Sequence, residues 1–223
     1  MVRVNILLGG PSEDYPQDFV DNPKDIPGYW AGADRGNLYL LQHGITPDLA
    51  VGDFDSIDQA DRELIESKVN DVHQYPPEKD DTDSELVMLI ANEKYNADEY
   101  YIYGVTSGRI DHFLVNLFLP FDERFDSFFD KIKFVSNTNT IEFRRPGSYT
   151  VTKEENMKYI GFVGLGAVDN LSILDAKYKL SNFNSDHPIS WASNEFVSNK
   201  IHYSFDSGVV AVIQSRDKKK TNN

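Results

Sequence analysis

The chain has 223 residues, 40% of them hydrophobic, which is enough to bury a substantial core as one large domain or two modest ones. Its formal net charge of −14 at pH 7 argues against a nucleic-acid surface, because phosphate backbones are bound by concentrated Lys and Arg. The absence of cysteine excludes disulfides and Cys-ligated metals and suits the cytoplasm, and no window approaches roughly 18 apolar residues, so we expect no membrane span.

From Met1 to about Phe129, short apolar runs alternate with longer amphipathic ones. The apolar runs predict strands at Val2–Leu8, Tyr29–Ala31, Leu49–Val51, Val72–Tyr75 and Tyr100–Tyr103. The amphipathic runs between them predict helices at Gly36–His43, Ile57–Lys68, Thr82–Tyr95 and Asp111–Leu119. This alternation is typical of βα units, so we expect a doubly wound, mostly parallel sheet.

After about Lys131 the runs become short and β-rich, with Gly, Asn, Ser or Asp between them. They predict strands at Ile132–Val135, Thr140–Phe143, Tyr149–Thr152, Tyr159–Val163, Leu171–Leu174, Ile201–Phe205 and Val209–Ile213. Strands at this spacing indicate a second, all-β domain, either a sandwich or a barrel. We therefore expect an α/β domain over residues 1–130, an all-β domain over 131–217 and a polar tail over 218–223, in which Lys218–Lys220 is solvated.

The segment Gly52–Ser56 carries two carboxylates, Asp53 and Asp55, at the end of a predicted strand. In open α/β sheets, ligands bind at the carboxyl ends of the strands. Two loop carboxylates at this spacing are able to face one hard cation, and oxygen ligands without Cys or His nearby favour Mg²⁺. The alternative is a simple helix entry, in which Asp55 or Ser56 caps the helix and Asp53 is solvated; Ser56 and Gln59 match a capping box.

A second acidic segment, Glu78–Glu85, holds five carboxylates in eight residues. Part of this acidity has a structural explanation, because Thr82 and Glu85 fit a capping box and the helix dipole favours negative charge in a first turn. The remaining carboxylates repel one another unless a cation or Lys79 offsets them, which favours a metal site.

The third segment, Gly104–His112, lies between a predicted strand and an amphipathic helix. Its glycines permit close approach of the backbone to a phosphate, and a helix N-terminus favours anions. Arg109 is able to pair with phosphate oxygens through two donors. Asp111 either orients Arg109 or binds the cation, and His112 is more typical of a helix face than of a catalytic base.

Taken together and in this order, the three segments resemble thiamin pyrophosphokinases. Members of that family carry GDFDS, K-D-x-T-D-x-E and G-x-x-G-G-R-x-D-H motifs. Here these motifs correspond to Gly52–Ser56, Lys79–Glu85 and Gly104–His112, and the resemblance extends to Ala33–Gly36, Pro47-Asp48, Tyr178–Leu180 and Ser193–Phe196. Two positions depart from the pattern: Arg35 replaces a glycine of Ala-Asp-Gly-Gly, and Ser107 replaces the first glycine of Gly-Gly-Arg.

The resemblance implies an α/β nucleotide-binding domain followed by a β-sandwich, in a homodimer that holds thiamin between the α/β domain of one subunit and the β domain of the other. It implies transfer of the β,γ-diphosphoryl group of ATP to the hydroxyl of thiamin, which gives thiamin diphosphate and AMP. We expect such a reaction to depend mainly on positioning and charge neutralisation.

The resemblance also suggests roles for individual residues. We assign Asp53, Asp55 and Asp83 to Mg²⁺, with Asp80 as a weaker candidate, and Asp48 or Asp53 as acceptor of the hydroxyl proton. Catalysis and ATP binding then involve Lys79, Asp80, Thr82, Thr106, Ser107, Arg109 and Asp111. For the cationic, aromatic thiamin the matching residues are Asp48, Tyr178, Ser193 and Asn194, with Trp191 as the alternative stacking partner.

Two rival functions fit part of this pattern. An aspartyl-phosphate phosphohydrolase has a D-x-D-x-[TV] motif similar to Asp53–Ile57, although Ile57 and the position outside the first strand disagree with it. It would release inorganic phosphate, whereas a diphosphokinase releases AMP. A non-catalytic thiamin or nucleotide sensor would bind both ligands and release no AMP.

Overall fold

The computed structural model describes residues 1–218, and the chain divides after Asn137 into two compact units. The first unit is built on a parallel sheet of β1 (Arg3–Leu7), β2 (Tyr29–Ala33), β3 (Leu49–Gly52), β4 (Val72–Gln74), β5 (Glu99–Tyr103) and β6 (Ile132–Val135). Their order across the sheet is β6-β5-β1-β2-β3-β4, and every neighbouring pair is parallel. All the carboxyl ends of these strands therefore lie at one edge.

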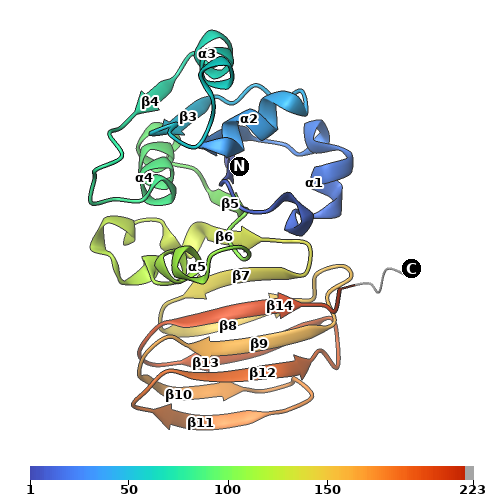
Figure 1. Ribbon diagram of the computed structural model, residues 1–223. Coiled ribbons are helices and arrows are strands. Elements are labelled where there is room, and N and C mark those ends of the chain that lie inside the picture. The colour runs from blue at the N-terminus through green and yellow to red at the C-terminus, as the bar shows by residue number, and fades with distance from the viewer. Residues whose placement is uncertain (219–223) are drawn as a thin grey trace. The chain divides into compact units, whose positions relative to one another are not determined.

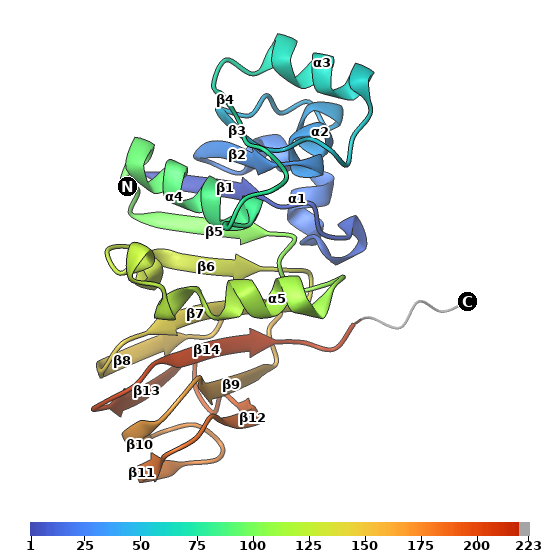
Figure 2. The same cartoon turned by 60° about the vertical axis from the view of Figure 1, so that its left-hand side comes forward.

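The helices of the first unit are α1 (Gln17–Asp21), α2 (Arg35–Gln42), α3 (Gln59–Lys68), α4 (Asp83–Tyr95) and α5 (Ile110–Leu117) (Figure 1). Short 3-10 turns lie at Ser12–Asp14, Pro23–Asp25, Leu119–Phe121, Glu123–Phe125 and Phe129–Lys131. Because crossovers between parallel strands are right-handed, the reversal of direction after β4 places α4 and α5 on the face opposite to α2 and α3 (Figure 2).

Side-chain alternation in the strands explains why both faces are covered. On one face, Leu40 of α2 packs with Leu7 of β1 and Trp30 of β2. The neighbouring residues Ile6 and Ala31 point to the other face and are fully buried as well, where α4 packs on β1, β2 and β3. A mixed α/β fold with a large parallel sheet thus agrees with the sequence.

Two helix starts were predicted from capping patterns, and the structure confirms one of them. Thr82 caps α4 in a full capping box with Glu85. The cap of α3 is Asp58, whose carboxylate accepts the N–H of Asp61, and the prediction that Ser56 would cap this helix is wrong. An aspartate directly before the first turn supplies a carboxylate acceptor, so the helix begins two residues later.

The second unit consists of antiparallel strands β7 (Asn139–Arg144), β8 (Gly147–Thr152), β9 (Tyr159–Gly164), β10 (Val168–Ile173), β11 (Leu180–Ser185), β12 (Ile189–Glu195), β13 (Lys200–Phe205) and β14 (Val210–Ser215). One group of strands has the order β12-β9-β14-β7 and the other the order β11-β10-β13-β8. Phe162 and Val212 from the first group share a core with Leu171, Ile201 and Phe205 from the second.

Some boundaries differ from the predicted ones. β6 was expected in the all-β domain, but it pairs in parallel with β5, so the division lies after Asn137 and not after residue 130. Strands β11 and β12 were not predicted, because Ser and Asn interrupt their apolar pattern. Of the predicted tail, residues 219–223 lie outside the described part of the chain.

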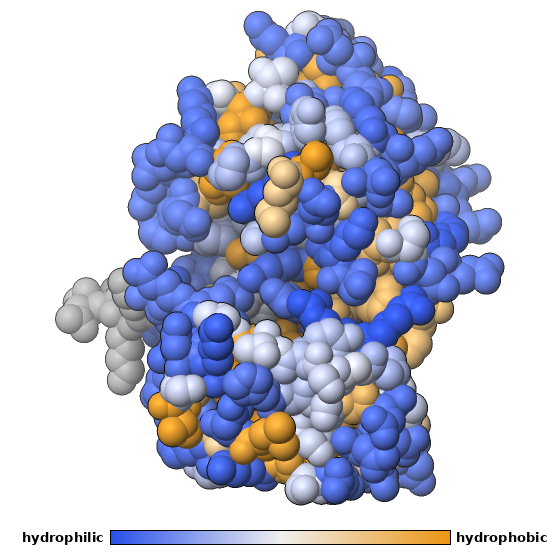
Figure 3. Space-filling view, turned by 180° about the vertical axis from the view of Figure 1, so that it is seen from behind, coloured by the Kyte–Doolittle hydropathy of each residue, from blue (hydrophilic) through white to orange (hydrophobic). Residues whose placement is uncertain are grey.

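The described residues contain no helix that is long and apolar enough to cross a membrane. On the face seen in Figure 3, hydrophilic residues cover most of the surface, as expected for a chain in which 26% of residues are charged.

Candidate active site

A cavity of about 660 Å³ opens at the carboxyl edge of the parallel sheet. It is lined by the segments that follow β1, β2, β3, β4 and β5 and by the first turn of α4. In the sheet, β1 lies between β2 and β5. The chain runs from β1 to β2 on one side of β1, whereas β5 and then β6 lie on the other side. The cavity is therefore at the topological switch point, where open α/β sheets bind ligands.

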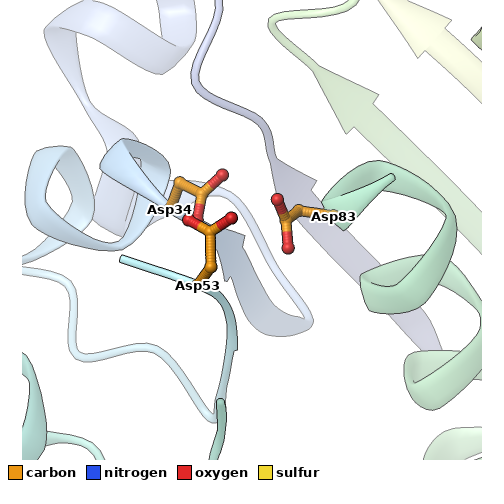
Figure 4. A group of neighbouring side chains, drawn as sticks. All are labelled: Asp34, Asp53 and Asp83. Carbon is orange, nitrogen blue, oxygen red and sulfur yellow. The ribbon is translucent and has the colours of Figure 1, made fainter. Parts of the chain in front are cut away.

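Three carboxylates meet in this cavity: Asp34, Asp53 and Asp83 (Figure 4). Asp34 is the N-cap residue of α2, Asp53 follows β3, and Asp83 is the first residue of α4. Each offers one oxygen, and these oxygens all lie within 4.8 Å of one another. Such a set of hard oxygen ligands suits Mg²⁺.

The backbone and the electrostatics at Asp34 are unusual. Its φ of 45° and ψ of −119° are rare for a residue with a side chain, and its buried Oδ1 has no hydrogen-bond partner among residues 1–218. Burial and the nearby carboxylates of Asp83 and Asp53 raise the pKa of Asp34 to about 7. The crowding of negative charge at a partly buried position is what a bound cation would relieve.

Lys79 supplies the positive charge nearest to the cluster. Its Nζ lies 3.0 Å from Oδ1 of Asp83 and 3.4 Å from Oδ2 of Asp53, and only 13% of its side chain is exposed. Burial alone would raise the pKa of Asp53, but the N–H of Asp55 and the ammonium of Lys79 lower it. Lys79, predicted as a phosphate ligand, is therefore the counter-ion of two carboxylates in this structure.

Asp55, predicted as a metal ligand, lies outside the group of three. Its side chain is exposed, and its N–H donates to Oδ1 of Asp53 over 3.1 Å. A hydrogen bond between the two side chains raises the pKa of Asp55. No role was predicted for Asp34. It stands in Ala33–Gly36, directly after a predicted strand, and this position is the signal that could have placed it at the same edge of the sheet as Asp53.

Two cations pair with the carboxylates of the acidic segment Glu78–Glu85: Lys79 with Asp83, and Arg124 with Asp81 and Glu85. Arg124 pairs with Asp81 over 2.7 Å and approaches Glu85 over 3.5 Å, so these carboxylates are offset without a metal. The side chain of Thr82 caps the helix, and Thr82 is also a lining residue of the cavity. Asp80, predicted to bind ATP or the metal, is exposed and does not line the cavity.

The loop Gly104–His112 forms another wall of the cavity. The buried hydroxyl of Ser107 has no hydrogen-bond partner within residues 1–218, and the residue lines the cavity. Arg109 also lines it and forms two hydrogen bonds with Asp111, so Asp111 orients Arg109. Thr106 and Asp111 are not among the lining residues.

Asp48 lies at the wrong end of its strand for the role predicted. It precedes β3, whereas Asp53 follows β3, so the two carboxylates are at opposite edges of the sheet. Oδ2 of Asp48 accepts the N–H of Trp30 over 2.8 Å. Its role in this structure is to hold the start of β2, and the position argues against proton transfer in the cavity.

The predicted thiamin residues of the second unit form a local group. Asn194 is buried, and its side chain accepts the N–H of Tyr178 over 2.9 Å and donates to its carbonyl over 2.7 Å. Tyr178 is 60% exposed. Ser193 is exposed at a φ of 58°, and Trp191 packs edge-on against Phe183. Asn194 thus positions Tyr178, an exposed aromatic residue whose ring centroid lies 5.5 Å from Nζ of Lys177.

Comparisons with known proteins cover almost the whole chain. Residues 26–136 match the family model "Thiamin pyrophosphokinase, catalytic domain", and residues 148–210 match "Thiamin pyrophosphokinase, vitamin B1 binding domain". The chain is 35% identical to the thiamine pyrophosphokinase of Bacillus subtilis, over 97% of this chain and 100% of that protein.

Solved structures agree with the family models. A thiamin pyrophosphokinase family protein from Enterococcus faecalis has a TM-score of 0.91 at 40% identity, over 97% of this chain and 100% of that chain. A protein from Lactobacillus plantarum has a TM-score of 0.88 at 43% identity, over 98% and 100% of the two chains.

Proposed function

The chain belongs to the thiamin pyrophosphokinase family, and from this premise we propose that it transfers the β,γ-diphosphoryl group of ATP to the hydroxyl of thiamin. The bond between the hydroxyl oxygen and the β-phosphorus forms, the bond between the β-phosphorus and the oxygen bridging to the α-phosphorus breaks, and the hydroxyl proton is released. The products are thiamin diphosphate and AMP. The observation that carries the proposal is the carboxylate cluster in a cavity walled by a glycine-rich loop.

The cluster fits Mg²⁺, and we propose Asp34, Asp53 and Asp83 as its ligands. Support comes from three oxygens within 4.8 Å, from Oδ1 of Asp34, which has no hydrogen-bond partner in the described part of the chain, and from the absence of Cys and His in the group. When bound, the ion would neutralise the negative charge of the phosphates. We retain Asp55 as an outer residue that orients Asp53 through its N–H.

The remaining charges of the cavity suit a polyphosphate. Lys79 and Arg109 are cations on its wall, and the Ser107 hydroxyl is a donor without a partner among the described residues. Because the pKa of Asp53 is lowered, this carboxylate is a weak base. We therefore expect positioning and charge neutralisation to lower the barrier, with little contribution from a dedicated base.

We further propose that the second unit is a β-sandwich that binds thiamin, and that two chains form a homodimer with each site shared between them. The exposed ring of Tyr178 offers a face for the cationic thiazolium, and Asn194 holds that segment in place. ATP as the second substrate and a cytoplasmic location belong to the same proposal.

The reaction is tested by incubating the protein with ATP, Mg²⁺ and thiamin and separating the products. We expect AMP and thiamin diphosphate in equal amounts, and none after chelation of the metal. Inorganic phosphate as the product would instead indicate a phosphohydrolase, and tight binding of both substrates without AMP would indicate a sensor.

Two neighbouring aspartates test the site itself. We expect Asp83→Asn to lower kcat/KM by at least about a hundredfold, roughly 2.7 kcal/mol in the barrier, because it removes a ligand of the cluster. Asp80→Asn is the matched control, since this carboxylate is exposed outside the cavity, and we expect it to stay within about threefold of the parent protein. Equal effects of the two changes would contradict the proposed ligand set.

A further inference from the structure

Arg35 connects two loops of the active-site edge. It follows Asp34 as the first residue of α2, and its guanidinium reaches the loop after β3. There Nε and Nη2 both donate to the backbone carbonyl of Ser56, over 3.0 and 2.9 Å. The planar fork of an arginine directs several donors at once, which a lysine ammonium on a flexible chain does less well.

The loop that Arg35 holds carries Asp53 and Asp55 and has few other anchors. Asp55 and Ser56 are exposed, and the deeply buried side chain is Phe54, at a φ of 58°. Phe54 fixes the middle of the loop in the core beneath α3. The Arg35 contact fixes the backbone two residues further on.

Open space borders this contact on two sides. Arg35 and Ser56 line the 660 Å³ cavity and also a second cavity of about 430 Å³, whose other walls come from α2 and from the start of α3. The two hydrogen bonds therefore form part of the partition between the cavities. Beyond the buried Phe54, the backbone at Asp55 and Ser56 is exposed, so its geometry depends on polar contacts such as this one.

We propose that Arg35 is a positioning residue, which holds the Asp53–Ser56 loop in the geometry that cation and ATP binding require. The inference rests on the proposed function. Arg35 stands where the family pattern has glycine, and within residues 1–218 it forms no ion pair with Asp53 or Asp83.

The test compares Arg35→Met and Arg35→Lys with a matched control, Arg62→Met. Arg62 is a partly exposed arginine of α3 that also makes two side-chain contacts, with Glu66 and Gln74, and it lines neither cavity. Thermal unfolding of each variant establishes that it folds. The readouts are Mn²⁺ binding in the presence of ATP, followed by electron paramagnetic resonance, and kcat and KM for both substrates.

We expect Arg35→Met to weaken Mn²⁺ binding by about tenfold and to lower kcat by a similar factor, as changes to residues that orient metal ligands do. Arg35→Lys should restore this only in part, added methylguanidinium should raise the activity of Arg35→Met, and Arg62→Met should match the parent protein.

Three results would overturn the proposal: parent-like Mn²⁺ binding and kcat in Arg35→Met, full function in Arg35→Lys, or a rise in the KM for ATP alone, which would indicate a direct phosphate contact. Failure of the proposed function is distinguishable, because the parent protein would then release no AMP, while Mn²⁺ binding would still report on Arg35.

Discussion

At Gly52, the space that a side chain would need is taken by the carboxylate of Asp34. A Cβ at position 52 would lie 2.1 Å from Oδ1 of Asp34, and the φ of Gly52 is +155°. The glycine of the GDFDS segment is thus required by the packing of its neighbour.

We expect Gly52→Ala to displace the Asp34 carboxylate, to lower activity by at least about a hundredfold and to destabilise the fold by roughly 1–3 kcal/mol. The control is Gly166→Ala, because nothing lies within 4 Å of a Cβ at that position, and we expect a change within about 0.5 kcal/mol. Urea unfolding and the AMP assay measure both quantities. Parent-like activity of Gly52→Ala would show that Asp34 is dispensable.

The ion pair of Lys94 and Asp71 links the stability of the fold to acid pH. Lys94 Nζ lies 2.5 Å from Oδ2 of Asp71, and this hydrogen bond lowers the pKa of that carboxyl. A lowered folded-state pKa stabilises the protein above the unfolded pKa, about 3.9, and the stabilisation disappears as the pH falls through the folded-state value.

We expect Lys94→Met to cost at most about 1 kcal/mol at pH 7, since the pair is about one-third exposed. The difference in unfolding free energy from the parent protein should shrink as the pH falls below about 3.9, where Asp71 is protonated first in the unfolded state, and disappear below the lowered folded-state pKa. Urea unfolding at pH 7 and pH 3 checks the sign. A difference that grows towards low pH would contradict the assignment.

At the scale of elements, the N-terminus of α4 combines a helix cap with a functional side chain. Thr82 caps the helix, Asp83 enters the carboxylate cluster one residue later, and Arg124 holds Asp81 and Glu85 on the outer side. A change in the cap therefore affects both the stability of the helix and the position of Asp83.

We expect Thr82→Ala to destabilise the protein by about 1 kcal/mol, a fall in Tm of roughly 2–4 °C, whereas Thr82→Ser keeps the capping oxygen and should stay close to the parent protein. Differential scanning calorimetry of the two variants measures the effect. A loss of ATP binding in both variants with unchanged Tm would instead identify the residue as a direct ligand contact.

The elements of the first unit were largely predictable, because strands and helices there carry a clear apolar period. What the sequence could not show is which side chains converge. Asp34 and Asp83 come from segments far apart in the chain, and their meeting depends on the order of strands in the sheet. Asp48 and Asp53 are close in sequence but are separated by the length of β3. Strand β11, LSNFNS, lacks an apolar period, so its place became visible only in the structure.

At the scale of the whole molecule, the proposed homodimer predicts complementation between two inactive variants. Asp83→Asn damages the first unit and Tyr178→Ala damages the second. If each site takes its two halves from different chains, mixed dimers have one intact site, and co-expression should restore about a quarter of the parent activity.

The assay measures AMP release by the co-purified mixture, and each variant alone is the control. Sedimentation at several concentrations establishes whether a dimer is present at all. No recovery of activity in a mixture that contains dimers would show that each site lies within one chain.

The parallel order of the first sheet leaves its amino edge without any of the residues proposed for catalysis. The exposed Thr46 lies on that side, before β3, whereas Asp53 follows β3. The four residues of this strand span about 13 Å. Because the chain contains no cysteine, Thr46→Cys would introduce a unique thiol. This thiol would attach the protein to a sensor surface or to a dye at one defined position, and the cavity would still face the solution.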